Sequence, residues 1–292
     1  VRYRTKLIQS QTAERNRLLK QLEIANIKLA SFMSDVFGVS GQRMLHALIA
    51  GKTDLLEIAR LAKGRLRSKI PLLTQALDGK LDDHHKFILS TQIRRLDQLK
   101  QDIEAVQLRI DEAIEPYRPA VELLKTIPGV DEVVAAAIVA EIGVDMSVFL
   151  SAHHLASWAG VCPGNNESAG KRRRTKVRKG NRHLRAMLVQ AGLAASKTKG
   201  TYLRSKYYSL RARRGPKRAV MAIGHKIIIA AHHILSTNTP FQELGDAYLD
   251  KRSEQRLQRS LVRRLERLGF DVQLTKNDDT AAEEQSPMIL SM

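Results

Sequence analysis

Ser168 stands at the entrance to the most basic stretch of the chain, beside the small residues Ala169 and Gly170. A hydroxyl held among Lys and Arg side chains near a phosphodiester can act as a nucleophile, because the cations stabilise the charge that develops on the phosphoryl group. Serine is also common in loops, so an ordinary loop serine is the alternative on spacing alone. Ser168 is the candidate catalytic residue, and the candidate phosphate-binding cations are Lys171, Arg172, Arg173, Arg174, Lys176, Arg178, Lys179, Arg182 and Arg185.

The excess positive charge is confined to one segment. The whole sequence has 49 Lys and Arg against 30 Asp and Glu, a net charge of +19. Residues 168–242 hold 19 of the basic residues and no acidic ones, so the rest of the chain has 30 of each sign. A concentrated positive surface favours polyanions, because phosphate contacts release counterions and steer association. Nucleic acid is the expected partner, and a solvated basic face or a patch on anionic lipid is the alternative.

A Pro-Gly turn joins two expected helices ahead of the basic segment. The residues Pro128, Gly129 and Val130 follow a short apolar helix, and Asp131 can cap the next helix. This order resembles the helix-hairpin-helix, in which backbone N–H groups cradle a nucleic-acid phosphate without reading sequence. Glycine would let the backbone approach the phosphate closely. We expect these three residues to contact phosphate, and a turn that only packs is the alternative.

Metal, disulfide and membrane chemistry have little support in the sequence. The single cysteine, Cys162, excludes an internal disulfide and a cysteine-cluster metal site. His183 and the pair His232-His233 lie in the acid-free segment, which lacks the carboxylates that Mg²⁺ prefers, so a structural role for them is favoured. We expect no metal site and no cofactor in this chain. With no signal peptide, no apolar run of about 18 residues and no amphipathic membrane helix, we expect no membrane partner and a cytoplasmic location.

Residues 1–118 are expected to form a helical, coiled-coil-like linker or oligomerisation region. A first stripe of apolar residues, spaced alternately by four and three positions, is typical of an amphipathic helix that runs to Val36. A longer helix is expected from Asp83 to near Pro116. The two could pair as an antiparallel hairpin or mediate formation of a homo-oligomer, and an ordinary helical core is the alternative. The first stripe is Leu18, Leu22, Ala25, Leu29, Phe32 and Val36; the second is Leu89, Ile93, Leu96, Ile103 and Ile110, with Lys100 and Gln107 at intervening core positions.

Residues 119–245 are expected to form a basic helical domain. The apolar stretch 219–235 predicts its buried core helix, and Trp158 is most simply a core anchor. A charged helix is expected within 246–274 and a disordered tail over 275–292. Because no region is rich in strand patterns, the expected fold class is mainly α, with a helix-hairpin-helix inside the second domain.

The order of the motifs resembles one family. A hairpin Ile-Pro-Gly-Val is followed by Ala-Ser-Trp-Ala-Gly-Val-Cys-Pro-Gly, by Glu-Ser-Ala-Gly-Lys, by Lys-Gly-Asn-Arg-His-Leu-Arg and by a basic Tyr/Arg-rich helix. Over residues 123–235 this is similar to the C-terminal domain of DEDD-type insertion-sequence transposases, the IS-one-ten family. The resemblance implies a DNA recombinase of a mobile element, with Ser168 as the nucleophile that forms a covalent intermediate. For some members it also implies an element-encoded guide RNA.

The chain also departs from that family. Members carry an N-terminal ribonuclease-H-like domain whose four acidic residues hold divalent metal. This chain opens in its helical region, so we expect a truncated copy without that domain, and Mg²⁺ is implied only for the missing part. We expect DNA binding, and whether this polypeptide alone is an enzyme stays open. The alternatives are a non-catalytic nucleic-acid-binding module with a helix-hairpin-helix phosphate clamp, and an oligomerisation factor built on the two heptad stripes.

Overall fold

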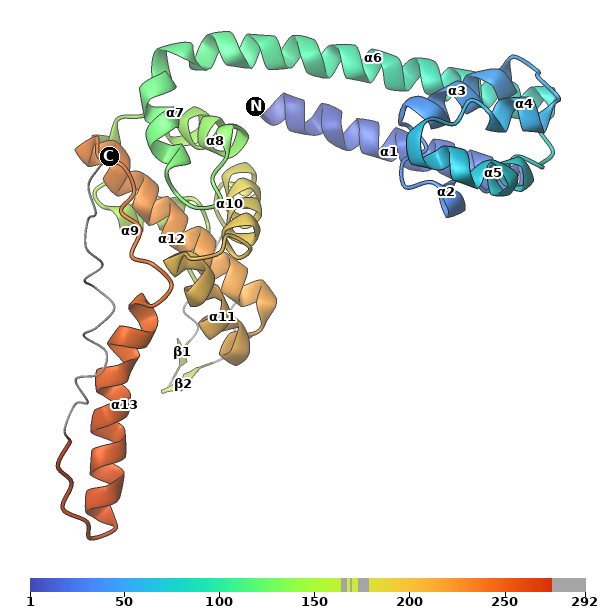
Figure 1. Cartoon of the computed structure of the whole chain (residues 1–292). Coiled ribbons are helices and arrows are strands. Elements are labelled where there is room, and N and C mark those ends of the chain that lie inside the picture. Colours follow the sequence, from blue (N-terminus) through green and yellow to red (C-terminus); the bar gives the residue numbers. More distant parts are fainter. Residues whose placement is uncertain (164–166, 169, 173–178, 275–292) are drawn as a thin grey trace, which may run out of the picture. The chain divides into compact units, whose positions relative to one another are not determined.

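The computed structural model describes residues 1–163, 167–168, 170–172 and 179–274, which are mainly helical, as the sequence predicted (Figure 1). They form two compact units. The first contains residues 1–122 and 135–144, and the second contains 123–134 and the described residues from 145 on. The elements are α1 (Arg2–Ile24), α2 (Leu29–Phe32), α3 (Val39–Ile49), α4 (Leu55–Ala59), η1 (Gly64–Lys69), α5 (Ile70–Ala76), α6 (Asp83–Ile114), η2 (Glu115–Tyr117), α7 (Arg118–Lys125), α8 (Glu132–Ile142), η3 (Met146–Val148), α9 (Ala152–Trp158), β1 (Glu167–Ser168), β2 (Lys171–Arg172), α10 (Arg182–Ala195), α11 (Tyr202–Arg214), α12 (Pro216–Thr237) and α13 (Tyr248–Arg267).

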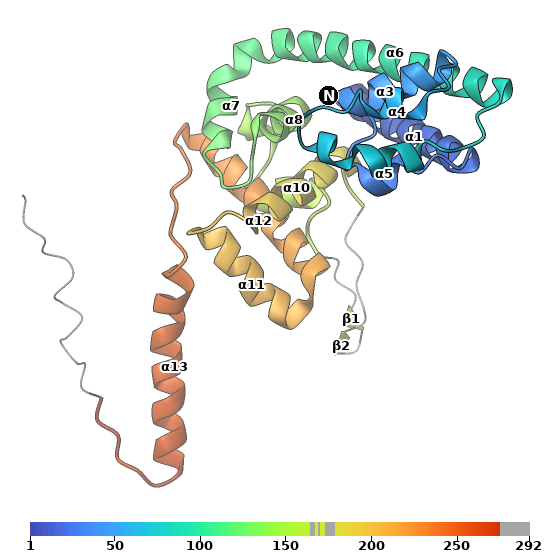
Figure 2. The same ribbon diagram turned by 45° about the vertical axis from the view of Figure 1, so that its right-hand side comes forward.

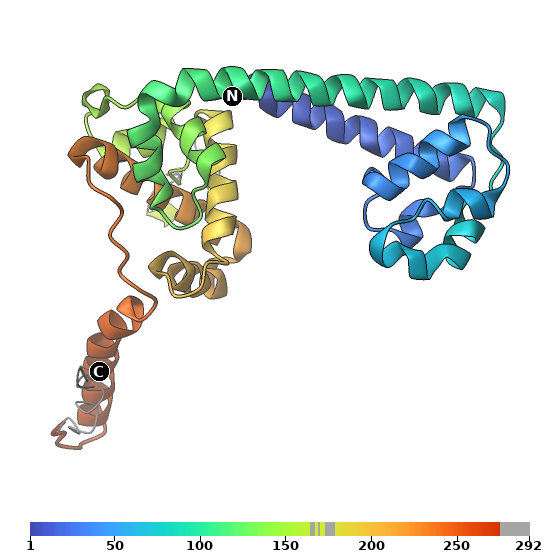
Figure 3. The ribbon, with the colours of Figure 1, turned by 45° about the horizontal axis from the view of Figure 1, so that its top comes forward.

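In the first unit, α1 and α6 pack as an antiparallel pair (Figure 3). Leu22 shares a buried cluster with Leu89, and Glu14 Oε2 lies 3.6 Å from Arg95 Nε, so residue numbers fall along α1 as they rise along α6. Glu14 is only 4% exposed and also accepts a hydrogen bond of 2.7 Å from Arg17. A buried carboxylate is costly without its partners, so these contacts favour one register of the two helices.

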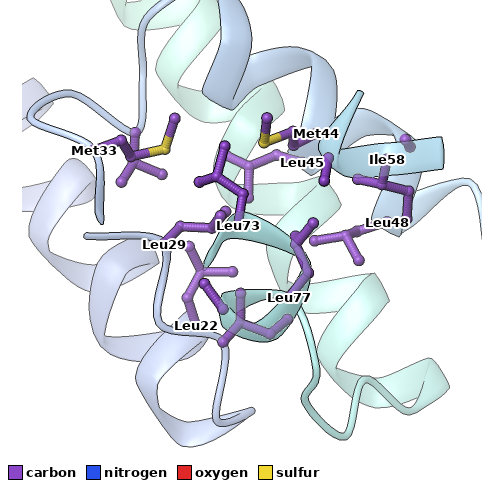
Figure 4. Close-up of a cluster of buried hydrophobic side chains, with 14 of the residues drawn as sticks. Leu22, Leu29, Met33, Met44, Leu45, Leu48, Ile58, Leu73 and Leu77 are labelled. Atoms are coloured by element: carbon purple, nitrogen blue, oxygen red, sulfur yellow. The ribbon is translucent and has the colours of Figure 1, made fainter. Parts of the chain in front are cut away.

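Between α1 and α6 the chain folds a small lobe from α2 to α5 and η1. Its core is apolar, and Figure 4 shows side chains from four of the lobe's segments and from α1 gathered together. Pro71 lies in the first turn of α5, where its missing N–H costs nothing. The labelled core residues in Figure 4 are Leu22, Leu29, Met33, Met44, Leu45, Leu48, Ile58, Leu73 and Leu77.

The helix predicted over residues 18–36 is wrong in its extent. Asn26 adopts a left-handed conformation with φ of 58°, which ends α1. Its N–H donates to the Glu23 carbonyl oxygen, and the N–H of Ile27 donates to that of Leu22, a Schellman closure that satisfies the last carbonyls of the helix. The apolar stripe is buried except at Phe32, which is half-buried, and its residues come from α1, α2 and the segments that follow each helix.

The long helix α6 has the predicted limits, but its buried seam differs from the predicted one. Leu99 is 8% exposed, whereas Lys100 is exposed. Gln107 is half-buried and donates a hydrogen bond of 2.7 Å to Asp111. Burying Leu99 in place of Lys100 avoids the cost of desolvating an ammonium group. Self-association through this region stays a prediction.

In the second unit, α12 is the buried core helix that the sequence predicted, and α10 and α11 pack against it (Figure 2). The short helix α9 also contacts α12. The packing with α10 is close: a Cβ at Gly192 would lie 2.9 Å from the Val220 carbonyl oxygen, and one at Gly224 would lie 3.0 Å from that of Leu188. By length and composition alone α12 could also cross a membrane, a test that the core helix of a soluble domain passes as well. Its buried residues are Ala219, Val220, Ile223, Gly224, Ile227, Ile228, Ala231 and Ile234.

Leu99→Ala should destabilise the first unit, whereas Lys100→Ala should leave it almost unchanged. Removing a buried leucine side chain costs about 2–3 kcal/mol of unfolding free energy, and an exposed substitution stays within about 0.5 kcal/mol. Urea unfolding followed by circular dichroism measures both variants. A larger loss of unfolding free energy in Lys100→Ala than in Leu99→Ala would show that Lys100, and not Leu99, lies in the buried seam.

Candidate nucleic-acid interface

The segment 162–180, here called the basic loop, connects α9 to α10, and its last residue lies against the C-terminus of α9. Gly160, with φ of 71°, follows α9 in the left-handed conformation typical of helix ends. At the far end of the loop, the N–H of Asn181 donates to the Trp158 carbonyl oxygen at 3.1 Å. A Cβ at Gly180 would lie only 2.5 Å from Gly160 Cα, so the two glycines let the loop ends touch. This closure joins residues about 20 positions apart, and no sequence pattern predicted it.

Ser168 lies in a short β-hairpin within the basic loop. Strands β1 and β2 are antiparallel, with Glu167 opposite Arg172 and Ser168 opposite Lys171. The turn between them has two residues, and its Gly170 has φ of 72°, which glycine adopts without strain. The backbone at Ser168, Lys171 and Arg172 is described, and their side chains are not. The predicted phosphate-binding residues Arg173, Arg174, Lys176 and Arg178 lie outside the described residues.

The end of the basic loop leads directly into α10. The side chain of Asn181 accepts hydrogen bonds of 3.0 and 3.1 Å from the N–H groups of His183 and Leu184, which caps the helix so that it begins at Arg182. Lys179 and Arg182 are exposed, and Arg185 is half-buried one turn further on. The structure therefore brings these three predicted cations to one place, the entrance of α10.

The predicted phosphate-binding turn lies between α7 and α8 and makes internal contacts. Gly129 has φ of 86°, and a Cβ there would lie 2.4 Å from the Ala195 backbone nitrogen in α10. The side chain of Val130 is 6% exposed, and its N–H donates to the Ile127 carbonyl oxygen at 3.0 Å. Pro128 is half-buried. These contacts explain the turn by packing, and a phosphate contact there stays a prediction.

Acidic side chains surround the start of α8. The Asp131 carboxylate accepts a hydrogen bond of 2.9 Å from the Val134 N–H, so the predicted cap is present. Glu132 Oε2 lies 2.9 Å from Lys125 Nζ. Carboxylates at a helix N-terminus occupy the place where an anion would gain most from the helix dipole. Local electrostatics therefore favour the entrance of α10 over this turn as a phosphate contact.

The segment from α7 into α11 can now be compared with known proteins. Residues 121–209 match the Transposase IS116/IS110/IS902 family. This segment is a transposase domain of that family. The match covers the turn at Gly129, the basic loop and all of α10. A comparison with curated proteins gives no match for the chain.

Trp158 in the transposase domain is not the predicted core anchor. Its side chain is 44% exposed and packs edge-on against Phe149, with ring centroids 5.8 Å apart. The helix α9 buries Leu155 and Ala156 instead, because these residues face the core and Trp158 lies on another side of the same helix. An exposed aromatic ring therefore stands at the point where the basic loop closes.

Two histidines of α12 have pKa values below the usual value for an imidazole group. Burial, followed by the nearby His153 and Lys226, lowers the pKa of His225 below its usual value of 6.5. Burial and then His233 lower the pKa of His232. Among the residues that the structure describes, no group of three His, Cys, Asp or Glu side chains could hold a metal ion.

Gly129→Ala should destabilise the second unit much more than Gly200→Ala. Both glycines have positive φ, 86° and 72°, so each substitution carries backbone strain of about 1 kcal/mol. Only at Gly129 would the added Cβ also meet the backbone of α10, which adds roughly 1–3 kcal/mol, whereas no atom lies within 4 Å at Gly200. Thermal unfolding of the two variants measures the difference, and equal losses would contradict the packing role of the turn.

Proposed function

We propose that this protein acts on DNA as a transposase, with the basic loop and the entrance of α10 contacting backbone phosphates. The observation that carries this proposal is the family match over residues 121–209, because the matched segment contains the whole basic loop. The physical support is the lack of carboxylates over residues 168–242, which leaves the cations there without acidic neighbours in sequence. A guide RNA stays a prediction of the resemblance alone.

The entrance of α10 is suited to phosphate contacts that do not read sequence. Lys179 and Arg182 are exposed, and the capped start of α10 holds the backbone that carries them. Each phosphate contact made by such a cation releases counterions, which contributes affinity that falls with salt. Arg182 and Arg185 are one turn apart, a spacing that can serve adjacent phosphates on one strand.

In this proposal, the Ser168 hydroxyl attacks a DNA phosphorus atom. A bond forms between Oγ and phosphorus, the bond from phosphorus to the leaving sugar oxygen breaks, and the proton lost by Ser168 passes to solvent while the leaving oxygen takes one up. Cations of the basic loop would stabilise the negative charge on the pentacovalent phosphoryl group. Reversal with a new sugar hydroxyl joins the strands. No step is assigned to Mg²⁺, for which the described residues supply no donor cluster.

Replacing Lys179 and Arg182 together by Ala should weaken binding to duplex DNA of any sequence. Each lost phosphate contact should also reduce the slope of log K against log salt by about 0.9. Fluorescence anisotropy with a labelled duplex at several salt concentrations measures both quantities. The control is Arg109→Ala, because the Arg109 guanidinium is exposed and already pairs with Glu112 at 2.7 Å. Unchanged affinity and salt slope in the double variant would show that the entrance of α10 does not contact DNA phosphates.

Ser168→Ala should leave DNA binding unchanged and should abolish strand joining when the acidic metal-binding domain that the family resemblance implies is supplied with the chain. The substitution removes one hydroxyl and no charge, so affinity and salt slope should stay within error of the wild type. A cellular assay that counts insertions of a marked element measures joining. The control is Ser236→Ala, which removes an exposed hydroxyl at the end of α12. Insertions retained by Ser168→Ala would remove this residue from the mechanism.

A further inference from the structure

The helix α11 and the start of α12 carry a second group of basic residues, which follows the basic loop in the sequence. Five of the thirteen residues of α11 are Lys or Arg, and none is acidic. The helix buries Leu203 and Tyr207 and leaves Tyr208 at 47% exposure. We define the α11 surface by six residues, Arg204, Tyr208, Arg211, Arg213, Arg214 and Lys217.

Two guanidinium groups lie near the ring of Tyr208 on α11. The Cζ atoms of Arg204 and Arg211 are 5.6 and 5.8 Å from the centre of its ring. The positions 204, 208 and 211 are one helical turn apart, so the three side chains form a strip along the helix. Both distances lie within the range of cation–π attraction, and nearly half of Tyr208 still faces solvent.

Charge accumulates where α11 meets α12. Arg211, Arg213, Arg214 and Lys217 are all exposed, and none of them is in an ion pair within the part of the chain that the structure describes. Lys217 lies in the first turn of α12, where the helix dipole favours acidic residues instead. Like charges at this density repel one another in the free protein, and a polyanion relieves that repulsion.

The tyrosine ring adds a preference that charge alone does not give. A duplex presents phosphates outward and keeps its base faces stacked inside, so it offers an exposed ring nothing to stack upon. An unpaired base has a free π face, and base–aromatic stacking on a cationic groove is the usual way in which proteins hold single strands. The α11 surface combines both parts, because it carries a half-exposed tyrosine ring with two guanidinium groups near it.

We propose that the α11 surface binds unpaired nucleotides of DNA, with a base stacked on Tyr208 and the neighbouring phosphates on its cations. The choice of DNA rests on the proposed function, because cutting and joining strands leaves nucleotides unpaired. The surface itself uses no residue of the basic loop or of the α10 entrance, so it is a distinct contact.

The test compares Tyr208→Leu and Tyr208→Phe in the full chain, using a labelled twelve-nucleotide thymidine strand and a labelled duplex. Tyr208→Leu should weaken binding to the single strand by at least about 5-fold, the lower limit for one stacked base, and binding to the duplex by less than about 2-fold. Tyr208→Phe keeps the ring and should bind both probes like the wild type. The salt slope should be unchanged, because the ring carries no charge.

Tyr117→Leu is the matched control, since Tyr117 is 44% exposed but belongs to η2 in the first unit. Equal losses on single strand and duplex, or no loss on the single strand, would overturn the proposal. So would a single-stranded RNA of matching sequence that binds tenfold more tightly than the DNA, because the surface would then serve RNA. As a folding control, the unfolding temperature of Tyr208→Leu is compared with that of the wild type. Equal temperatures would show that a loss of binding comes from the missing ring and not from unfolding.

The two proposals fail in different ways. If the variants of Lys179 and Arg182 keep full duplex affinity, the proposed function of the α10 entrance fails, while Tyr208→Leu still reports on the single strand. If Tyr208→Leu has no effect while the duplex measurements succeed, only the α11 surface is lost. A charge variant, Arg214→Ala, should lower the salt slope on the single strand by about 0.7 per lost contact.

Discussion

Close backbone contact on two sides of α10 is the constraint on which the second unit depends. Gly129 approaches the C-terminal half of this helix, and Gly192 and Gly224 let it approach α12. At each place a side-chain carbon would collide with main-chain atoms, so the three glycines set how near the helices can come. Because α10 is held in this way, its first turn has a fixed position from which Arg182 and Arg185 can act.

The basic loop makes use of this fixed position. It leaves the end of α9 after Gly160 and returns there at Gly180, where the next residue caps α10. Charge that would be costly within a helical core is therefore carried on a segment whose ends are anchored on that core. The family to which residues 121–209 belong assigns a transposase role to this segment, and the loop is the part of it with the greatest positive charge.

Sequence patterns predicted the helices better than their contacts. The limits of α6, the burial of α12 and the cap at Asp131 followed from local chemistry that the residues alone express. The break at Asn26 and the seam at Leu99 did not, because each pattern was compatible with two arrangements and packing chose between them. Exposure of Trp158 and closure of the basic loop depend on residues distant in sequence, for which a single chain gives no periodic signal. The packing of the turn at Gly129 is of the same kind, since glycine fits both a phosphate contact and a close helix contact.

The absence of carboxylates from residues 168–242 gives dissolved salt two opposite effects on this protein. In the free chain, ions screen the mutual repulsion of the cations and so favour the folded state. In the complex, the same ions compete with phosphate groups and promote dissociation. The second unit without DNA is therefore least stable at low salt concentration. At low salt, bound DNA also stabilises the folded state most, since any ligand that binds only the native state stabilises it by mass action.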